Sequence, residues 1–362
     1  MSIINNIMRV PVRIVFAIGI LETVILFLLL MSLCTFLLYV VDKRNAIKGR
    51  FRISERVLIF FTLFFGAFGA FFGMKMMKHK IRTKKFKIVL MLGFMMVMMP
   101  VIHLVHGFTL DKMVRFVEVE FHSERWPAAL DGYRIAFMTD FHNISNEINM
   151  FRNDILSVVQ ALEHRNVDMV LLGGDFSTRG DRYQQTLTQI AKGHFGGIHG
   201  NDGIFGVEGN HDDYMRLFAQ MHAVNIIPLD NSGVPIRPGF YLAGVQDLWN
   251  RNPNIDAAIS GAQPDDFVLL IAHNPDVVMQ QSTTGVDLIL SGHTHGGQIT
   301  FFGWPFYLFR GSITDYGTRF GHGWNTSRDD TPVFTSRGVG PYYDVPRVFS
   351  RPEVVILTMY RK

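Results

Sequence analysis

The chain has 362 residues, of which 48% are hydrophobic and 18% are charged, and its formal net charge at pH 7 is +4. This composition excludes a disordered or collagen-like protein. The one cysteine, Cys34, excludes an intramolecular disulfide, a cysteine-based zinc finger and an iron–sulfur cluster. Residues 1–109 carry 15 Lys+Arg and 3 Asp+Glu, whereas residues 110–362 carry 20 and 28. Because the C-terminal part is acidic and repels phosphate, no nucleic acid is expected as a partner.

The N-terminal third is expected to be a membrane region. Uncharged apolar runs occupy residues 23–41, 57–74 and 88–105. A helix of about 18 residues is roughly 27 Å long, close to the hydrocarbon thickness of about 30 Å. None of the runs has the polar stripe of a soluble amphipathic helix. We therefore expect a membrane anchor of about three apolar helices over residues 1–108, in contact with phospholipids, and a linker with a first strand over residues 109–130.

Two basic segments flank the middle apolar run. Residues 42–56 hold six Lys or Arg, and residues 75–87 hold seven. Lys and Arg concentrate on the cytoplasmic side of membrane segments, so both are expected there. If the middle run crosses the membrane, the two segments lie on opposite sides and one breaks the rule. If the run, with its small residues Gly66, Gly69 and Gly73, forms a re-entrant or tightly packed hairpin, both can be cytoplasmic. Charge alone leaves both alternatives open, together with the side of the C-terminal domain.

Residues 20–105 resemble a small, uncharacterised bacterial membrane domain. The matching pieces are Asp42-Lys43 with Ala46, Arg52 with Glu55, the Gly-Ala-x-Gly-Ala run at 66–70, and His79-Lys80 before Phe86. The resemblance implies an integral protein of the bacterial inner membrane and supplies no activity. The i, i+3 spacing of Arg52 and Glu55 predicts an ion pair within a helix.

From about residue 110 the pattern becomes that of an α/β (α+β) domain with buried strands. Short apolar runs lie at 134–139, 167–172, 203–207, 241–245, 267–272, 286–290, 333–336 and 353–359. Helical patterns lie near 147–164, 181–192 and 213–223. Apolar runs that alternate with helices predict buried strands covered by helices.

Polar clusters follow five of these strands. They are Asp140-Phe141-His142, Gly174-Asp175, Gly209-Asn210-His211-Asp212, His273-Asn274 and Gly292-His293-Thr294-His295. Ligands gather at the carboxyl ends of strands in α/β sheets, so these segments are expected to converge. Carboxylate, imidazole and amide donors without a thiolate suit Mn, Fe or Zn. The donors are too many for one tetrahedral ion, but two divalent metal ions that share a carboxylate would use them all.

The pattern D-x-H, GD, GNH[DE], H, GHxH is complete and in order, and over about residues 130–362 the chain resembles the calcineurin-like metallophosphoesterases. The resemblance implies a four-layer αββα sandwich over residues 131–362 with a dinuclear centre. It also implies that one metal is bound by Asp140, His142, Asp175 and His295, and the second by Asp175, Asn210, His273 and His293. His211 is implied as a transition-state stabiliser or leaving-group acid, and Asp212 as the residue that orients it through a hydrogen bond.

Two stretches differ from many relatives, and two others resemble one branch of the family. Asn143-Ile144-Ser145 and Phe176-Ser177-Thr178 depart from the usual residues after the first two blocks, which puts the substrate geometry in doubt. Gly296-Gly297-Gln298-Ile299 and the tail near 336–340 and 351–353 resemble bacterial membrane-associated enzymes, including hydrolases of UDP-2,3-diacylglucosamine in lipid A synthesis. The two glycines at 296–297 permit either a tight turn or a close approach of the backbone to substrate.

These features together predict a membrane-anchored dinuclear metallophosphoesterase. A metal-bridging hydroxide would attack a phosphate monoester, diester or pyrophosphate, on a lipid or envelope-related substrate. One alternative is a non-catalytic membrane sensor or scaffold, against which the intact His211 and ligand set count. Another is a nuclease-type phosphodiesterase, against which the acidic C-terminal part counts.

Overall fold

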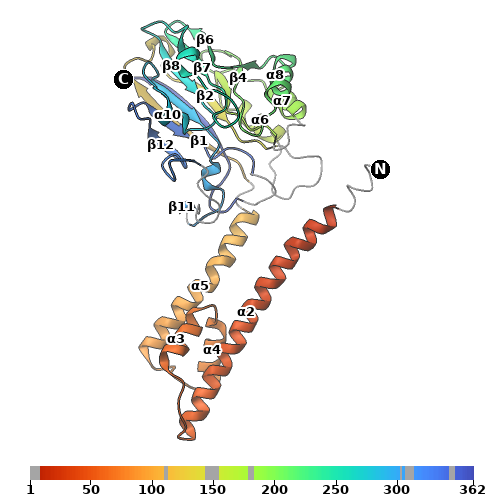
Figure 1. Ribbon diagram of the computed structural model, residues 1–362, viewed down its shortest axis with the longest axis vertical. Coiled ribbons are helices and arrows are strands. Elements are labelled where there is room, and N and C mark those ends of the chain that lie inside the picture. Colours follow the sequence, from red (N-terminus) through yellow and green to blue (C-terminus); the bar gives the residue numbers. More distant parts are fainter. Residues whose placement is uncertain are drawn as a thin grey trace. The chain divides into compact units, whose positions relative to one another are not determined.

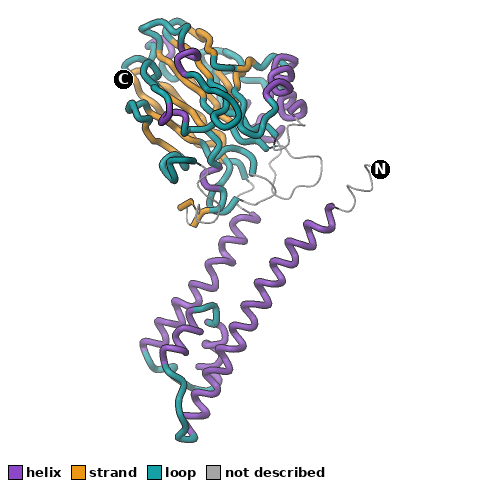
Figure 2. Tube along the Cα trace, in the orientation of Figure 1, coloured by secondary structure: helices purple, strands orange, loops and turns teal. Residues whose placement is uncertain are grey.

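The computed structural model describes residues 9–109, 113–142, 155–177, 183–301, 304–305, 314–341 and 347–362. The chain divides into two compact units at Leu104 and Val105. Helices make up the N-terminal unit, and strands with covering helices make up the C-terminal unit (Figure 2).

The N-terminal unit holds the three apolar runs, but the middle run is not one helix. The helices are α2 (Arg9–Ile47), α3 (Glu55–Leu63), α4 (Ala67–Met76) and α5 (Lys84–Thr109) (Figure 1). The run at 57–74, for which a spanning helix and a tightly packed hairpin are both open from the sequence, is divided between α3 and α4. The break lies at Phe65, which has a positive φ of 61°, and at Gly66, whose backbone passes close to α2. A break set by packing against another helix leaves no trace in hydropathy.

Much of the surface of α2 is apolar and exposed. Among the side chains that the structure describes, the segment Ile25–Ile47 is long and apolar enough to cross a membrane. Leu26, Leu29 and Leu33 on it are each more than half exposed. A continuous exposed apolar surface marks a contact with lipid or with another protein.

The ion pair predicted between Arg52 and Glu55 is replaced by two others. Helix α3 begins only at Glu55, with Ser54 as its N-cap, so Arg52 lies outside the helix and the i, i+3 geometry does not arise. Arg52 pairs with Asp42 at 3.2 Å, and Glu55 pairs with Lys80 at 2.6 Å.

The C-terminal unit contains two six-stranded sheets. The order in the first is β1 (Arg115–Ser123), β14 (Glu353–Arg361), β2 (Tyr133–Met138), β3 (Met169–Leu172), β4 (Ile204–Gly206) and β5 (Ile227–Pro228). The order in the second is β12 (Gly323–Thr326), β13 (Pro332–Thr335), β9 (Leu288–Ser291), β8 (Phe267–Ile271), β7 (Phe240–Gly244) and β6 (Ser232–Arg237). Strands β2 to β5 are parallel to one another, as are β7, β8, β9 and β13.

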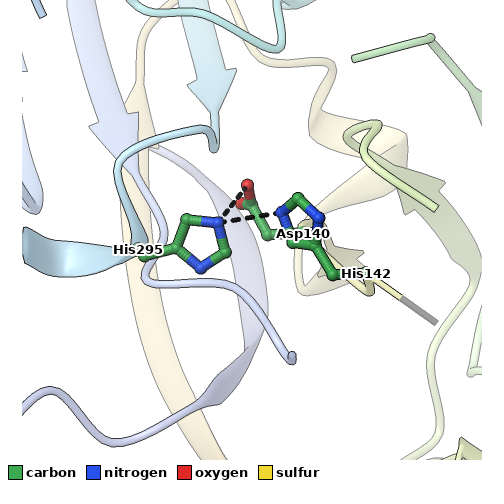
Figure 3. Close-up of side chains that lie close together, drawn as sticks. All are labelled: Asp140, His142 and His295. Atoms are coloured by element: carbon green, nitrogen blue, oxygen red, sulfur yellow. Dashed lines mark hydrogen bonds and ion pairs between the residues drawn. The ribbon is translucent and has the colours of Figure 1, made fainter. Parts of the chain in front are cut away.

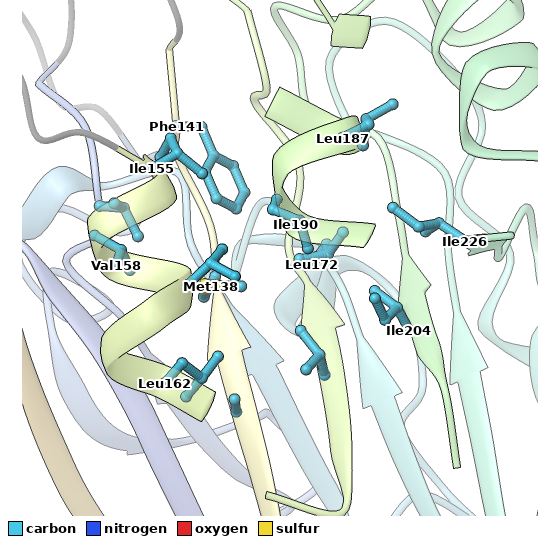
Figure 4. Packing of buried hydrophobic residues seen from close by; sticks show 14 of the residues in the cluster. Met138, Phe141, Ile155, Val158, Leu162, Leu172, Leu187, Ile190, Ile204 and Ile226 are labelled. Atoms are coloured by element: carbon cyan, nitrogen blue, oxygen red, sulfur yellow. The ribbon is translucent and has the colours of Figure 1, made fainter. Parts of the chain in front are cut away.

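Alternate side chains along the strands build the layers. Ile135 and Phe137 of β2 share one core with Leu269 of β8, between the sheets. Ala136 and Met138 face the other way, onto α6 (Ile155–Glu163), α7 (Tyr183–Ala191) and α8 (Tyr214–Ala223), as Figure 4 shows for α6 and α7. The second sheet packs its outer face against α9 (Ile255–Ile259) and α10 (Val277–Gln280). The predicted four-layer αββα sandwich is confirmed.

The helices expected in this unit match in their described parts. Helix α8 covers the pattern at 213–223, while α6 and α7 cover 155–163 and 183–191. Residues 147–154 and 181–182 of the two earlier patterns, and the departures at Asn143-Ile144-Ser145 and Thr178, lie outside the described residues. Short elements complete the unit: η2 (Ala128–Leu130), η3 (His295–Gly297), β10 (Thr300–Phe301) and β11 (Trp304–Pro305).

Candidate metal centre

The polar clusters meet because the strands before them are parallel and in register. Met138, the last residue of β2, pairs with Leu172, the last of β3, which in turn pairs with Gly206 at the end of β4. In the second sheet, Ile271 at the end of β8 pairs with Leu290 of β9. The loops after these strands therefore leave from one edge of each sheet, as expected for an α/β ligand site.

Six of the predicted ligands form two buried groups. Asp140, His142 and His295 make up the first, and Asp175, His273 and His293 the second; within each group the ligand atoms lie within 4.8 Å of one another. In the first group, shown in Figure 3, His295 Nε2 lies 3.0 Å from His142 Nε2 and 3.4 Å from Asp140 Oδ1.

Asp175 lies between the two groups. Its Oδ2 is 3.3 Å from His142 Nε2 and 3.3 Å from His273 Nε2, so one oxygen faces both. Asn210 joins the second group: its Oδ1 is 2.9 Å from His293 Nδ1 and 3.2 Å from His273 Nε2. The structure thus brings all seven predicted ligands together, with Asp175 where a shared carboxylate is expected. Their assignment as metal ligands stays a prediction.

Burial and neighbouring charges shift the pKa values of several predicted ligands far from their ordinary values. Burial raises the pKa of Asp140 to about 7, against the opposing effect of His273. Burial lowers the pKa of His142 to about 3. Burial would also lower the pKa of His273, but the Asp175 carboxylate raises it to about 10. Buried charges need close partners, and lone pairs that converge in this way are the donor set of divalent cations. The residues therefore fit two such ions.

One ligand has a fixed ring orientation. The Nδ1 of His273 lies 2.7 Å from the carbonyl oxygen of Gly173, which can only accept, so Nδ1–H donates. Its Nε2 therefore faces the centre and is the atom that would bind a metal once its proton has left. Outer partners usually orient metal-bound histidines in this way.

The ligands stand on strained backbone. Five residues that are not glycine have positive φ at the strand ends, namely Asp140 (55°), His142 (43°), Asp175 (55°), His293 (71°) and His295 (52°). Such conformations cost of order 1–3 kcal/mol each and cluster at functional sites. Hydrogen bonds between the loops hold them, including Asp140 N to Gly174 O and His142 N to Asp175 O, both 2.9 Å. The strain supports a functional rather than a merely structural cluster.

Glycines in the predicted ligand motifs leave room for the loops after the strands to approach one another. A Cβ on Gly209 would lie 2.2 Å from Asp175 Oδ1, and one on Gly292 would lie 2.6 Å from Asp140 Oδ2. Any side chain there would displace a predicted ligand. Gly296 and Gly297 have positive φ of 57° and 81°, and a Cβ on Gly296 would lie 2.6 Å from Arg337 Cγ, so the tight turn and its packing favour glycine.

The two predicted catalytic residues differ in their settings. The ring centroid of His211 lies 5.3 Å from that of His142, so His211 stands beside the first group, half-buried. The predicted role of Asp212 in orienting His211 stays a prediction, but the structure shows that Asp212 also links two loops. Its carboxylate accepts hydrogen bonds from four backbone N–H groups, those of Asp175 (2.8 Å), Gly209 (2.8 Å), Phe176 (3.0 Å) and Ser177 (3.4 Å). It ties the loops after β3 and β4 together and so positions Asp175.

Two neighbours of the centre were missed in the sequence. The ring centroid of Trp249 lies 4.5 Å from that of His293, edge-on at 89°, and the residue is 53% exposed. Trp249 follows β7, which is parallel to β8, so the strand-end argument could have found it. Arg347 is buried, and its Nη2 lies 3.0 Å from His295 Nδ1. No local pattern marks Arg347, because the contact depends on how the chain folds back before β14.

Comparisons with known proteins place these observations in a family. Residues 32–86 match "Protein of unknown function (DUF1294)", which confirms the resemblance of the N-terminal region, and residues 133–297 match "Calcineurin-like phosphoesterase". An "Uncharacterized metallophosphoesterase" of Helicobacter pylori is 29% identical over 241 residues, covering 63% of this chain and 60% of that protein. A "Transmembrane protein with metallophosphoesterase domain" of Danio rerio is 26% identical over 271 residues, covering 68% and 57%. The "Uncharacterized metallophosphoesterase YkuE" of Bacillus subtilis is 25% identical over 259 residues, covering 68% and 86%.

The chain spans about three fifths of the first two relatives. None of the three names states a substrate, so the resemblance to diacylglucosamine hydrolases gains no support from them. The family match, the αββα sandwich and the two buried ligand groups agree with one another. Residues 133–297 therefore form a calcineurin-like phosphoesterase domain, a hydrolase domain, which follows a DUF1294 region.

Proposed function

We propose that the protein is a membrane-anchored metallophosphoesterase that hydrolyses a phosphate ester or pyrophosphate bond in a lipid or envelope-related substrate. The observation that carries the proposal is the pair of buried ligand groups with the Asp175 carboxylate between them. One ion is assigned to Asp140, His142, Asp175 and His295, and the other to Asp175, Asn210, His273 and His293.

Mn, Fe or Zn suits this mixture of oxygen and nitrogen donors. Bound there, two divalent cations would supply the acidification of water and the neutralisation of phosphoryl charge. The chain supplies the rest. His211, at the rim of the first group, is placed to donate a hydrogen bond to a phosphoryl oxygen or a proton to the leaving oxygen. Its backbone N–H donates to Asp175 Oδ1 at 2.9 Å, which fixes its distance from the centre. The exposed ring of Trp249 offers an apolar surface for the rest of the substrate.

The membrane anchor rests on the apolar helix α2 and on the relative that is named a transmembrane protein. We place the protein in the bacterial inner membrane. A tether confines the centre to the bilayer surface, where lipid-linked and envelope phosphoesters are concentrated, and this favours them over soluble substrates.

The test uses the full chain in detergent with added Mn²⁺. Wild-type protein is expected to hydrolyse bis-p-nitrophenyl phosphate, and Asp140→Asn is expected to reduce turnover to background with the fold retained. Asp265→Asn, an exposed position on the loop before β8, is the matched control and should keep wild-type turnover. Wild-type protein that holds fewer than one metal per chain and stays inactive with Mn²⁺ would indicate a ligand-binding sensor instead.

A further inference from the structure

The N-terminal unit has two basic loops, within residues 42–56 and 75–87, and they meet at one end of its helices. Asp42, near the end of α2, is fully buried and lies 3.2 Å from Arg52 in the first loop and 2.7 Å from His79 Nε2 in the second. Glu55, at the start of α3, pairs with Lys80 of the second loop at 2.6 Å. A buried carboxylate that loses its partners is strongly destabilising, so these contacts hold both loops at this end.

The chain between the loops is apolar but too short to span the bilayer twice. Helices α3 and α4 have 9 and 10 residues. At 1.5 Å per residue each is roughly 14 Å long, about half of a hydrocarbon core. No charged residue occurs from Val57 to Met74, and Phe64 and Phe68 beside the turn are exposed. In Figure 1, α3 and α4 lie beside the half of α2 that ends at the first loop. The turn between them therefore suits hydrocarbon rather than water.

The packing of this hairpin meets the requirement for irregular backbone inside a membrane. A Cβ on Gly66 would lie 2.0 Å from Thr35 Oγ1, and one on Gly69 would lie 1.7 Å from Ser32 O, so the backbone of α4 lies directly on α2. At the break, Gly66 N donates to Phe61 O at 3.1 Å, and Thr35 Oγ1 donates to the same oxygen at 3.3 Å. Non-helical backbone at membrane depth is tolerated where protein buries it and satisfies its polar groups.

We infer that α3 and α4 form a re-entrant hairpin, that both basic loops face the cytoplasm, and that the phosphoesterase domain lies on the extracytoplasmic side. The inference rests on the membrane anchor of the proposed function. Helix α5 has 26 residues and is about 39 Å long, enough to cross the bilayer once. It leads from the second loop to β1. Because α5 crosses once, the second loop before it and the phosphoesterase domain after it lie on opposite sides of the membrane.

The positive charge of the two loops indicates which side of the membrane is cytoplasmic. The segments 42–56 and 75–87 carry thirteen Lys or Arg and two acids, Asp42 and Glu55, both of which are paired. Most of the cations are exposed, namely Arg44, Lys48, Arg50, Arg52, Arg56, Lys75, Lys78, Arg82, Lys84, Lys85 and Lys87. A basic end of this kind matches the anionic cytoplasmic leaflet. The substrate is then a phosphoester on the extracytoplasmic side of the inner membrane. This excludes cytoplasmic nucleotide-linked lipids such as UDP-2,3-diacylglucosamine.

Cysteine accessibility in spheroplasts tests this topology. The full chain with Cys34→Ser receives one new cysteine at a time, as Lys48→Cys in the first loop, Arg82→Cys in the second, or Asp265→Cys in the phosphoesterase domain; all three positions are exposed. A membrane-impermeant maleimide is added before or after permeabilisation, with an endogenous cytoplasmic thiol protein as leakage control. Asp265→Cys should label fully in intact spheroplasts, and both loop variants only after permeabilisation.

Two results would overturn the inference. Labelling of Lys48→Cys and Arg82→Cys from opposite sides would mean that the middle run crosses the membrane. Labelling of both loops, with Asp265→Cys protected, would mean that the orientation is reversed. Hydrolysis of bis-p-nitrophenyl phosphate by each variant in detergent is measured in parallel. Its absence in every preparation would count against the proposed function and leave the labelling result unaffected.

Discussion

Replacement of Asp212 by asparagine distinguishes a loop-tying role from an effect on His211. The carboxylate accepts two N–H groups on each oxygen, from Asp175 and Gly209 on Oδ2 and from Phe176 and Ser177 on Oδ1. Asparagine has one carbonyl oxygen, which would keep the two shorter hydrogen bonds, from Asp175 and Gly209. Its NH₂ group would then face the N–H groups of Phe176 and Ser177. Two hydrogen bonds to a charged group are then lost, one of them long, for a cost of about 3 kcal/mol. For a unit of this size that lowers Tm by roughly 6–12 °C.

The assay is thermal unfolding of the metal-loaded full chain, together with metal content per chain. Asp212→Asn should lower both Tm and metal content, because the same loops carry Asp175. Asp213→Asn is the matched control, since asparagine serves equally well as the N-cap of α8 and should leave both unchanged. The reasoning is refuted if Asp212→Asn keeps the wild-type Tm and metal content and loses only turnover, because that pattern is the one expected for a partner of His211.

Three further outcomes are expected. Removal of the metals with a chelator should abolish hydrolysis. It should also lower the stability of the protein by about 2.7 kcal/mol for each metal site, relative to protein with free metal at 100 times its Kd. Thermal unfolding at two Mn²⁺ concentrations measures this, and an unchanged Tm would count against a metal site. Trp249→Ala should raise KM for esters with an apolar group more than it lowers kcat, whereas Trp249→Phe should restore KM; equal loss in both variants would contradict the apolar contact. Burial would raise the pKa of Glu353, but hydrogen bonds and charges from His322 and Arg337 lower it to about 2. Its stabilising effect is therefore present above pH 4.5 and lost as the pH falls toward 2. Glu353→Gln should cost about 3 kcal/mol at pH 7, and urea unfolding should show this difference from wild type shrinking at pH 3.

The predictable part of the centre followed from strand ends. Parallel strands bring the residues that follow them to one edge of the sheet, so the sequence alone groups Asp140, Asp175 and His293. The sandwich followed from the same alternation of buried runs and helices. These features depend on local sequence and on sheet geometry, which periodic patterns report well.

The rest depended on contacts between distant segments. The glycines of the run at 57–74 leave a hairpin open as one alternative, but the break itself depends on the close approach of Gly66 to Thr35, which no hydropathy window contains. The spacing predicts an ion pair of Arg52 with Glu55. Arg52 pairs with Asp42 instead, because α3 starts three residues after Arg52. Asp212 was placed by motif position, whereas its four backbone partners are set by the crossing of two loops.

The most direct test of the account is the metal content of the purified full chain, measured together with hydrolysis. Elemental analysis of wild-type protein reconstituted with Mn²⁺ is expected to give two metal ions per chain and hydrolysis of bis-p-nitrophenyl phosphate. Asp175→Asn, which changes the one carboxylate that faces both groups, is expected to lose metal from both positions and all turnover. Wild-type protein with less than one ion per chain and no turnover, or an Asp175→Asn variant with full metal content and activity, would contradict the account.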